Sequence, residues 1–393
     1  MKIIILFSNK LKFFFEKVKE IVESFSEKSV RPITWALSFL GIIATRLFID
    51  NFVPKTEKLG ILTIMDVHNL FFFLITLLLI WLFLSLILRQ NVFSLSYLML
   101  WGSLMFIFPP IIDIIKTRGS VYWSFYVLDN PQGLWMNFIT IFGKLPSGNV
   151  YFGTKIIFIA AIIMISAFIY IKVKSFIKIF LGALLTYAIF FFMGSFPSWV
   201  TFSYYFFQRS INISDVNSVK IIEFVAIPYK IFGLEIDNLN YALAYNLNLI
   251  YFLFLIFLLS ILFFAGNRKK FLAFLKNSRP PQIIYHSGLF FTGLFLGWLA
   301  YPENLNINIF SISAMLALIS SIWLAWEASV IFNDIYDFEI DKISNPGRPL
   351  QKEIFRLKEY SDLGLILFIL SLIGGLTVGA QFMFMLLVYQ FIA

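Results

Sequence analysis

Long apolar runs separated by short polar stretches dominate the hydropathy pattern of the chain. Most runs have about 17 to 25 residues, enough for a helix to cross the hydrocarbon core of a bilayer. The pattern therefore predicts an all-α, multi-pass transmembrane bundle. We expect about ten spans, near residues 33–52, 68–88, 94–115, 153–171, 176–197, 247–266, 283–300, 309–333, 361–378 and 380–393.

A different pattern precedes the first span. Between residues 10 and 31, apolar side chains recur at helical spacing with Lys, Glu and Ser between them. This pattern predicts an amphipathic helix on the membrane surface, although a plain solvated helix before the first span fits it nearly as well. We assign no function to residues 1–32, which we expect to be cytoplasmic.

Composition supports the membrane assignment independently. Apolar residues make up 60% of the chain, charged residues 13%, and the mean hydropathy is +0.86, a balance that excludes an ordinary soluble domain. The net charge of +9 resides in short tracts between spans, which favours topology signals and contacts with anionic lipids over nucleic acid. The absence of cysteine excludes disulfides, thiolate metal sites and a cysteine nucleophile.

The basic tracts also predict an orientation and a domain boundary. The N-terminal basic group, Arg89 and the basic tracts at 172–178 and 268–279 fall on alternate loops, so we expect these loops to be cytoplasmic in a cell membrane. The last tract, followed by two prolines, separates a six-span region of unknown function at 33–271 from a second domain at 272–393.

One polar cluster carries most of the chemistry. The string NDIYDFEIDK begins at Asn333, where an apolar run ends and a transmembrane helix is expected to leave the bilayer. If that helix continues to about Asn345, then Asn333, Asp337 and Asp341 drift only about 40° per step around it. These three side chains then share one face, and Asp334 lies at its edge.

Carboxylates crowded near a helix C-terminus repel one another and face the negative end of the helix dipole. A divalent cation would relieve both effects, and few oxygen ligands partly shared with water suit Mg²⁺ that carries a phosphate-bearing substrate. The alternative is that Lys342, Arg348 and Lys352 simply neutralise the acids at the level of the lipid headgroups.

The longer string NDIYDFEIDKISNPGRPL resembles the first aspartate-rich motif of the UbiA superfamily of intramembrane prenyltransferases. Ser278-Arg279-Pro280-Pro281 before a hydrophobic helix is similar to the start of that catalytic domain, so the resemblance covers about residues 272–393. Gln351-Lys352 departs from the family pattern, which often has a small residue and a glycine there.

This resemblance implies Mg²⁺-dependent transfer of an isoprenoid group from a prenyl diphosphate to a lipophilic acceptor. Asp337 and Asp341 would be catalytic, and the implied metal ligands are Asn333, Asp334, Asp337 and Asp341. The expected diphosphate contacts are Lys342, Arg348 and Arg279.

The family also has a second aspartate-rich motif on a later helix, which the printed sequence does not contain before Ala393. We therefore expect either a piece of a longer protein or half of an active site. The competing class is a non-enzymatic membrane protein, a transporter or scaffold, whose acids bind a cation or contact a partner.

Two further charges lie within apolar runs. Glu327 is seven residues before Asp334, so it extends the same helix face about 10 Å deeper into the bilayer. It is expected either to line a pocket for the acceptor or to pair with a basic residue of another helix. Arg46 lies near a span end and is expected to snorkel to the interface.

Overall fold

The computed structural model describes residues 16–17, 19–20, 22–25, 28–52, 64–118, 126–142, 152–209, 211–227 and 239–392. Within these ranges every regular element is a helix, which confirms the predicted all-α fold. In the amphipathic segment predicted at 10–31, the described residues 16–17, 19–20 and 22–25 are helical, whereas 28–31 are not.

Nine helical segments of the described chain are long and apolar enough to cross a membrane. They are Pro32–Asn51, Ile64–Leu88, Val92–Thr117, Phe152–Val173, Phe176–Gly194, Ala242–Gly266, Pro280–Ala300, Ile309–Tyr336 and Leu357–Val378. The tenth predicted span corresponds to α17 (Ala380–Ile392), an apolar helix of 13 residues and about 20 Å. The chain is an integral, multi-pass membrane protein.

The structure divides into two compact units. The first comprises residues 1–59, 76–127 and 131–196, and the second comprises 60–75, 128–130 and 197–393, in each case for the described positions. The predicted functional boundary near residue 272 stays a prediction.

The first unit contains mainly membrane-spanning helices. They are α2 (Pro32–Phe52), the end of α3 (Ile64–Leu88), η1 (Val92–Leu95), α4 (Ser96–Ser103), η2 (Leu104–Ile107), α5 (Phe108–Thr117), α6 (Pro131–Ile139), α7 (Phe152–Val173) and α8 (Phe176–Gly194). Arg46 does not snorkel: it is buried, it donates to the Phe106 carbonyl at 2.6 Å, and its Nε lies 3.3 Å from an Asp50 carboxylate oxygen. These partners satisfy the charge inside the unit.

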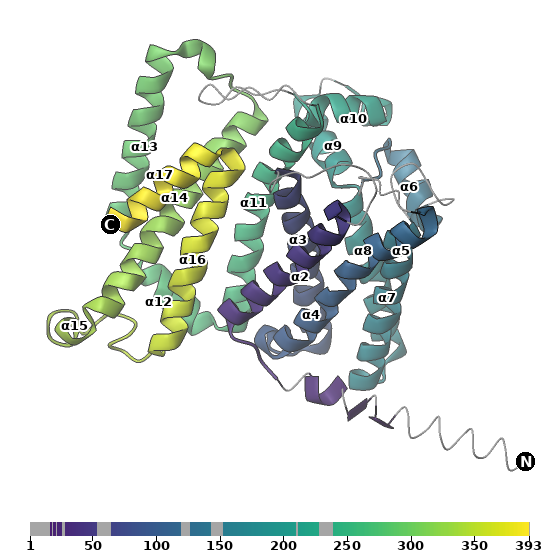
Figure 1. Ribbon diagram of the computed structural model, residues 1–393, viewed down its shortest axis with the longest axis horizontal. Helices are drawn as coiled ribbons and strands as arrows, with labels where there is room; N and C mark the ends of the chain where they lie inside the picture. The colour runs from purple at the N-terminus through teal and green to yellow at the C-terminus, as the bar shows by residue number, and fades with distance from the viewer. Residues whose placement is uncertain are drawn as a thin grey trace, which may run out of the picture. The chain divides into compact units, whose positions relative to one another are not determined.

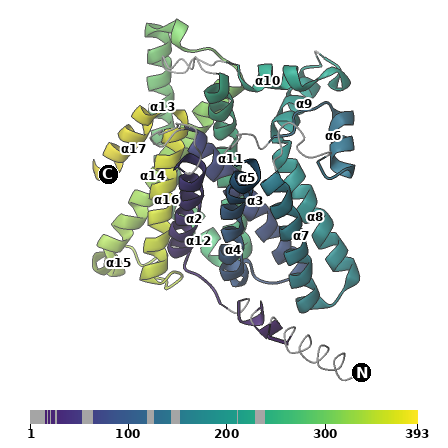
Figure 2. The ribbon, with the colours of Figure 1, turned by 45° about the vertical axis from the view of Figure 1, so that its right-hand side comes forward.

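The second unit contains the polar motif. Its elements are the start of α3, α9 (Phe196–Gln208), η3 (Ile213–Asp215), α10 (Ser218–Val225), α11 (Leu239–Gly266), α12 (Arg268–Asn277), α13 (Pro280–Ala300), η4 (Pro302–Asn304), α14 (Ile309–Tyr336), α15 (Phe338–Ser344), α16 (Leu357–Val378) and α17. Asn308 fixes the start of α14, because its side chain accepts from the backbone N–H groups of Phe310 and Ser311. In Figures 1 and 2, α14 and α16 run side by side.

Two glycines allow α16 to approach its neighbours closely. A Cβ atom at Gly364 would lie 2.9 Å from Ile331 of α14. A Cβ atom at Gly374 would overlap the side chains of Ser321 on α14 and Phe252 on α11. Glycine is therefore required where α11, α14 and α16 meet, and this packing fixes α16 beside the polar end of α14.

Candidate functional site at the end of helix α14

The polar motif begins on α14 and turns at Asp337. Helix α14 ends at Tyr336 and α15 begins at Phe338, so the single helix expected to reach Asn345 is divided by a turn. The helical direction nevertheless continues, because Asp337 N–H donates to the Asn333 carbonyl and Asp341 N–H to the Asp337 carbonyl, each at 2.8 Å. Asn345 then ends α15 directly before the proline.

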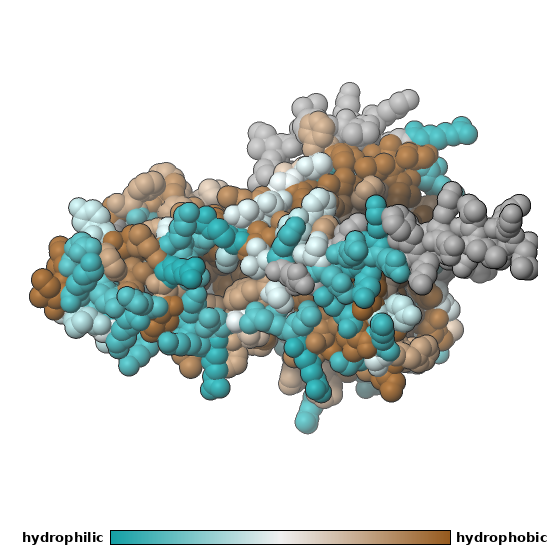
Figure 3. Space-filling model, turned by 90° about the horizontal axis from the view of Figure 1, so that it is seen from below, coloured by the Kyte–Doolittle hydropathy of each residue, from teal (hydrophilic) through white to brown (hydrophobic). Residues whose placement is uncertain are grey.

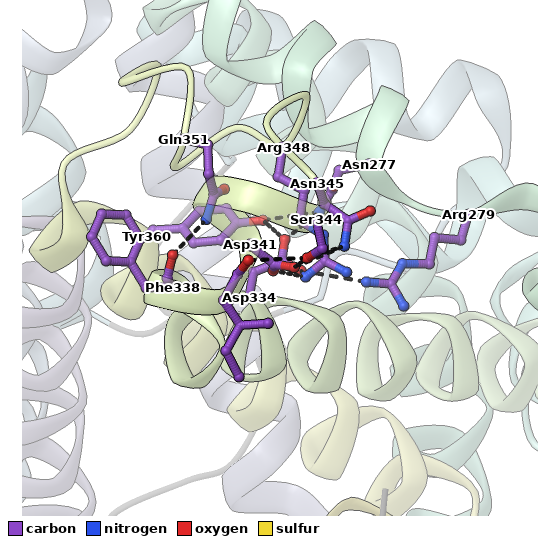
Figure 4. A network of polar contacts seen from close by, with 11 residues as sticks. Asn277, Arg279, Asp334, Phe338, Asp341, Ser344, Asn345, Arg348, Gln351 and Tyr360 are labelled. Atoms are coloured by element: carbon purple, nitrogen blue, oxygen red, sulfur yellow. Dashed lines mark hydrogen bonds and ion pairs between the residues drawn. The ribbon is translucent and has the colours of Figure 1, made fainter.

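Asp334 is the centre of the site and is 0% exposed. Oδ1 accepts from Arg348 at 2.7 Å and from Arg279 at 3.4 Å. Oδ2 accepts from Asn277 at 2.8 Å and from the Tyr360 hydroxyl at 3.0 Å (Figure 4). These four donors occupy the hydrogen-bonding capacity of the carboxylate, which is the condition for burying its charge. Asp334 thereby connects α14 to α12, α13, α16 and the loop after α15.

Asp341 is the second buried acid, at 2% exposed. Its Oδ2 pairs with the same Nη1 of Arg348 that contacts Asp334. Its Oδ1 accepts from the side-chain amide of Asn345 at 2.8 Å and from the Ser344 hydroxyl at 3.3 Å. One guanidinium group therefore joins two aspartates that are seven residues apart, and Figure 4 shows the side chains converging.

The loop between α15 and α16 holds Arg348 in place through an apolar anchor. Leu350 and Phe355 are buried with Ile331 and Tyr360 in one hydrophobic cluster. The backbone N–H of Ile354 donates to the carbonyl of Pro349 at 3.0 Å, which closes a tight turn. The loop is thus anchored directly after the arginine by side chains that water does not reach.

The connection between α12 and α13 supplies two of the four donors to Asp334, namely Asn277 and Arg279. Asn277 is the last residue of α12, and Pro280 begins α13, where the missing N–H of proline costs no hydrogen bond. Arg279 between them adopts a left-handed backbone conformation with φ of 49°. This sharp turn brings Asn277 and Arg279, two residues apart, to the same carboxylate.

The structure brings together four of the predicted site residues, namely Asp334, Asp341, Arg279 and Arg348. Lys342 lies outside this network: its ammonium group pairs with Glu339 at 2.8 Å. Asn333 is exposed and Asp337 is half-buried, and the hydrogen bonds of the network do not include their side chains.

Sequence reasoning missed Asn277, Tyr360 and Asn345. Asn345 had a local signal, since it lies four residues after Asp341 on the expected helix. Asn277 and Tyr360 are 57 and 26 residues from Asp334 in the chain, so only the tertiary packing reveals their contact.

The surroundings of the site are strongly basic. Figure 3, viewed from this end of the molecule, shows hydrophilic side chains gathered over it. The ends of α12, α15, α16 and the loop between them contribute Arg268, Lys269, Lys270, Lys276, Lys342, Lys352, Arg356 and Lys358. One of these is paired across the helices, Lys270 with Glu359 at 2.6 Å. The surplus of positive charge suits an anionic ligand.

A metal ion held by the protein alone does not fit the described residues, which contain no group of three or more His, Asp or Glu side chains placed to hold one. Asp334 and Asp341 already have cationic partners. Of the predicted metal ligands, Asn333 and Asp337 remain available. They lie one helical turn apart and offer an amide oxygen and a carboxylate. Such a pair suits Mg²⁺ when phosphate and water supply the other ligands.

Glu327 lies deeper on α14 and is buried, at 6% exposed. Its Oε1 has no hydrogen-bond partner among the described residues, and no ion pair of Glu327 with a basic side chain is found there. The predicted partner on another helix is therefore not seen in the part of the chain that the structure describes.

Comparison with known proteins agrees with the chemistry of this region. Residues 289–393 match the model of the UbiA prenyltransferase family, within the range where the sequence resemblance was recognised. No curated protein and no solved structure matches the chain. The matched range contains the whole aspartate motif and Tyr360, whereas Asn277 and Arg279 precede it. The match supports a membrane prenyltransferase in general.

Proposed function

We propose that the protein transfers an isoprenoid group from a prenyl diphosphate to a lipophilic acceptor, with the diphosphate bound at the polar end of α14. The observation that carries the proposal is the buried pairing of Arg348 with Asp334 and Asp341 inside the range that matches the prenyltransferase family. This pairing presents a fixed guanidinium group where a membrane helix ends, which is where a donor with an apolar chain and an anionic head would lie.

Two arginines are the candidate diphosphate contacts. The side chains of Arg348 and Arg279 are 19% and 33% exposed, so each has surface left for a ligand while its aspartate partner holds it in position. Guanidinium groups bind phosphate oxygens in a bidentate manner and stabilise the negative charge that develops as the diphosphate leaves. Lys342 is a more remote candidate because it is paired with Glu339.

Mg²⁺ is the proposed cofactor, with Asn333 and Asp337 as the protein ligands that are open to it. The bound ion would neutralise charge on the leaving diphosphate. Asp341 would join these ligands only if Arg348 transferred its contact from the aspartate to the diphosphate. Asp334, with four donors, is better suited to positioning the arginines than to binding metal.

The apolar helices have a second role in this proposal. Breaking the allylic C–O bond produces carbocation character on the donor, and water would capture it. Helices α13, α14 and α16 carry apolar side chains beyond the polar end, where the isoprenoid chain of the donor would lie. These side chains would limit water to the polar end of the unit. The basic tracts further support placing this end at the cytoplasmic side of a cell membrane, where soluble prenyl diphosphates have access to it.

The test is divalent-dependent release of diphosphate by the purified protein in lipid nanodiscs, with farnesyl diphosphate as the probe. Asp337→Ala is expected to abolish release without loss of membrane insertion. Glu339→Ala is the matched control, because this acid belongs to the same motif but is exposed and paired with Lys342. Unchanged turnover in purified Asp337→Ala would refute the assignment, and transport of the probe without release would favour the transporter alternative.

A further inference from the structure

Glu327 is a buried acid that the proposed diphosphate site does not use. It lies seven residues, or two helical turns, before Asp334 on α14, so both side chains project from nearly the same face of the helix about 10 Å apart in depth. Arg279 and Asp334 act on it electrostatically, but neither is hydrogen-bonded to it. An ionisable side chain at such a depth is costly and is therefore a marker of function.

Two further polar groups near this depth also lack partners. Trp326 Nε1 and the Tyr389 hydroxyl are buried without a hydrogen bond among the described residues. His286 links their positions, because its ring centroid lies 4.8 Å from that of Trp326 and 5.8 Å from that of Tyr389. Helices α13, α14 and α17 therefore place two unused donors around His286, and the unused acceptor Glu327 follows Trp326 in α14.

The buried serine hydroxyls of α14 are satisfied. The hydroxyls of Ser313, Ser321 and Ser329 each donate to the carbonyl four residues before them. Trp323 Nε1 donates to Ser287 on α13 at 2.8 Å. Because buried tryptophan and tyrosine usually find hydrogen-bond partners, the unfilled atoms of Trp326 and Tyr389 mark this region as a candidate ligand site.

We propose that Glu327, with Trp326 and Tyr389, binds the polar end of the prenyl acceptor, and that the acceptor reacts through a hydroxyl group. The inference rests on the proposed function, since it assumes that a donor diphosphate lies beside Asp334. The unfilled atoms match such a ligand: a hydroxyl donates one hydrogen bond, to Glu327, and accepts from Trp326 or Tyr389.

The acceptor oxygen forms a bond to the first carbon of the isoprenoid as the bond from that carbon to the diphosphate oxygen breaks, with its electron pair leaving on the diphosphate. The hydroxyl proton passes to the Glu327 carboxylate and then to water. Glu327 is therefore the general base of the transfer and the residue that selects a protic acceptor.

A binding experiment tests the selection without any donor. The protein in nanodiscs is photolabelled with a diazirine-bearing alkylphenol, and the labelled peptides are mapped by mass spectrometry. Competitors are two matched pairs, 4-nonylphenol with its methyl ether and 1-dodecanol with its methyl ether. We expect labelling of peptides that contain His286, Glu327 or Tyr389. At least one hydroxyl competitor should block labelling at about tenfold lower concentration than its methyl ether, because a site built for a hydroxyl rejects the analogue without one.

Glu327→Gln is expected to weaken this preference, since a neutral amide oxygen accepts a weaker hydrogen bond from the hydroxyl than a carboxylate does. Ser329→Ala on the same helix is the control and is expected to retain it, because that hydroxyl is bonded within its own helix. Equal competition by both hydroxyls and their ethers, or an unchanged preference in Glu327→Gln, would overturn the inference.

The activity assay separates this inference from the proposed function. In Glu327→Gln we expect transfer to the hydroxyl probe to fall at least about a hundredfold, within the range for loss of a general base. Release of diphosphate to water should persist. Asp337→Ala should lose both reactions. If the wild-type protein releases no diphosphate, the proposed function fails, whereas normal transfer by Glu327→Gln contradicts only the role of Glu327.

Discussion

Arg348 reaches back across α15 to Asp334, with 2.7 Å between its Nη1 atom and the Oδ1 atom of the aspartate. The same nitrogen contacts Asp341, so a single cation neutralises two buried acids. Two of the acids that the sequence marks as metal ligands, Asp334 and Asp341, are therefore paired with an arginine in this structure.

The first prediction concerns Arg348→Lys. Lysine keeps the charge but lacks the planar set of donors that can contact two carboxylates and a phosphate together. We expect diphosphate release to fall at least about tenfold, because one good charged hydrogen bond is worth about 1.5 to 3 kcal/mol. Lys342→Arg is the control and should remain near the wild-type rate, since Lys342 pairs with exposed Glu339. Equal losses in the two variants would contradict the central position of Arg348.

The second prediction concerns Tyr360→Phe. This change removes the hydroxyl that donates to Asp334 at 3.0 Å and accepts from Asn277 at 3.1 Å, and it leaves the buried carboxylate one donor short. We expect a loss of about 1 to 3 kcal/mol in the free energy of unfolding. Thermal unfolding in detergent measures it, with Tyr336→Phe as the control because Tyr336 is 90% exposed. A melting temperature unchanged in both variants would show that the hydroxyl contributes nothing to stability.

The sequence predicts the spans and the position of the motif well, because hydropathy and the NDIYDFEIDK string depend on local residues. It could not predict the partners of Asp334, since Asn277 and Tyr360 reach it through the packing of α12 and α16. The turn at Asp337 was also missed. No proline or glycine marks this turn, and the helical spacing of the acids continues through it.

The third prediction concerns the close packing beneath the site. Gly374→Ala places a methyl group into the side chains of Ser321 and Phe252, so these side chains or α16 itself must shift. We expect a destabilisation of about 1 to 3 kcal/mol, as for other overpacked cores. Gly293→Ala on α13 is the matched control because no atom lies within 4 Å of the added Cβ. Similar unfolding of both variants would contradict the tight junction of the three helices.

The last prediction separates the metal from the fold. Within the described residues, the charges of Asp334 and Asp341 are balanced by Arg279 and Arg348, so their burial needs no divalent cation. Removal of Mg²⁺ with EDTA is therefore expected to abolish diphosphate release. The melting temperature of the ligand-free protein should change by less than about 2 °C, far less than it would if a buried ion pair were lost. Added Mg²⁺ should restore release in the wild-type protein and not in Asp337→Ala. A large fall in melting temperature on chelation would instead show that a cation replaces Arg348 between the two aspartates, and Asp334 would then return to the set of metal ligands.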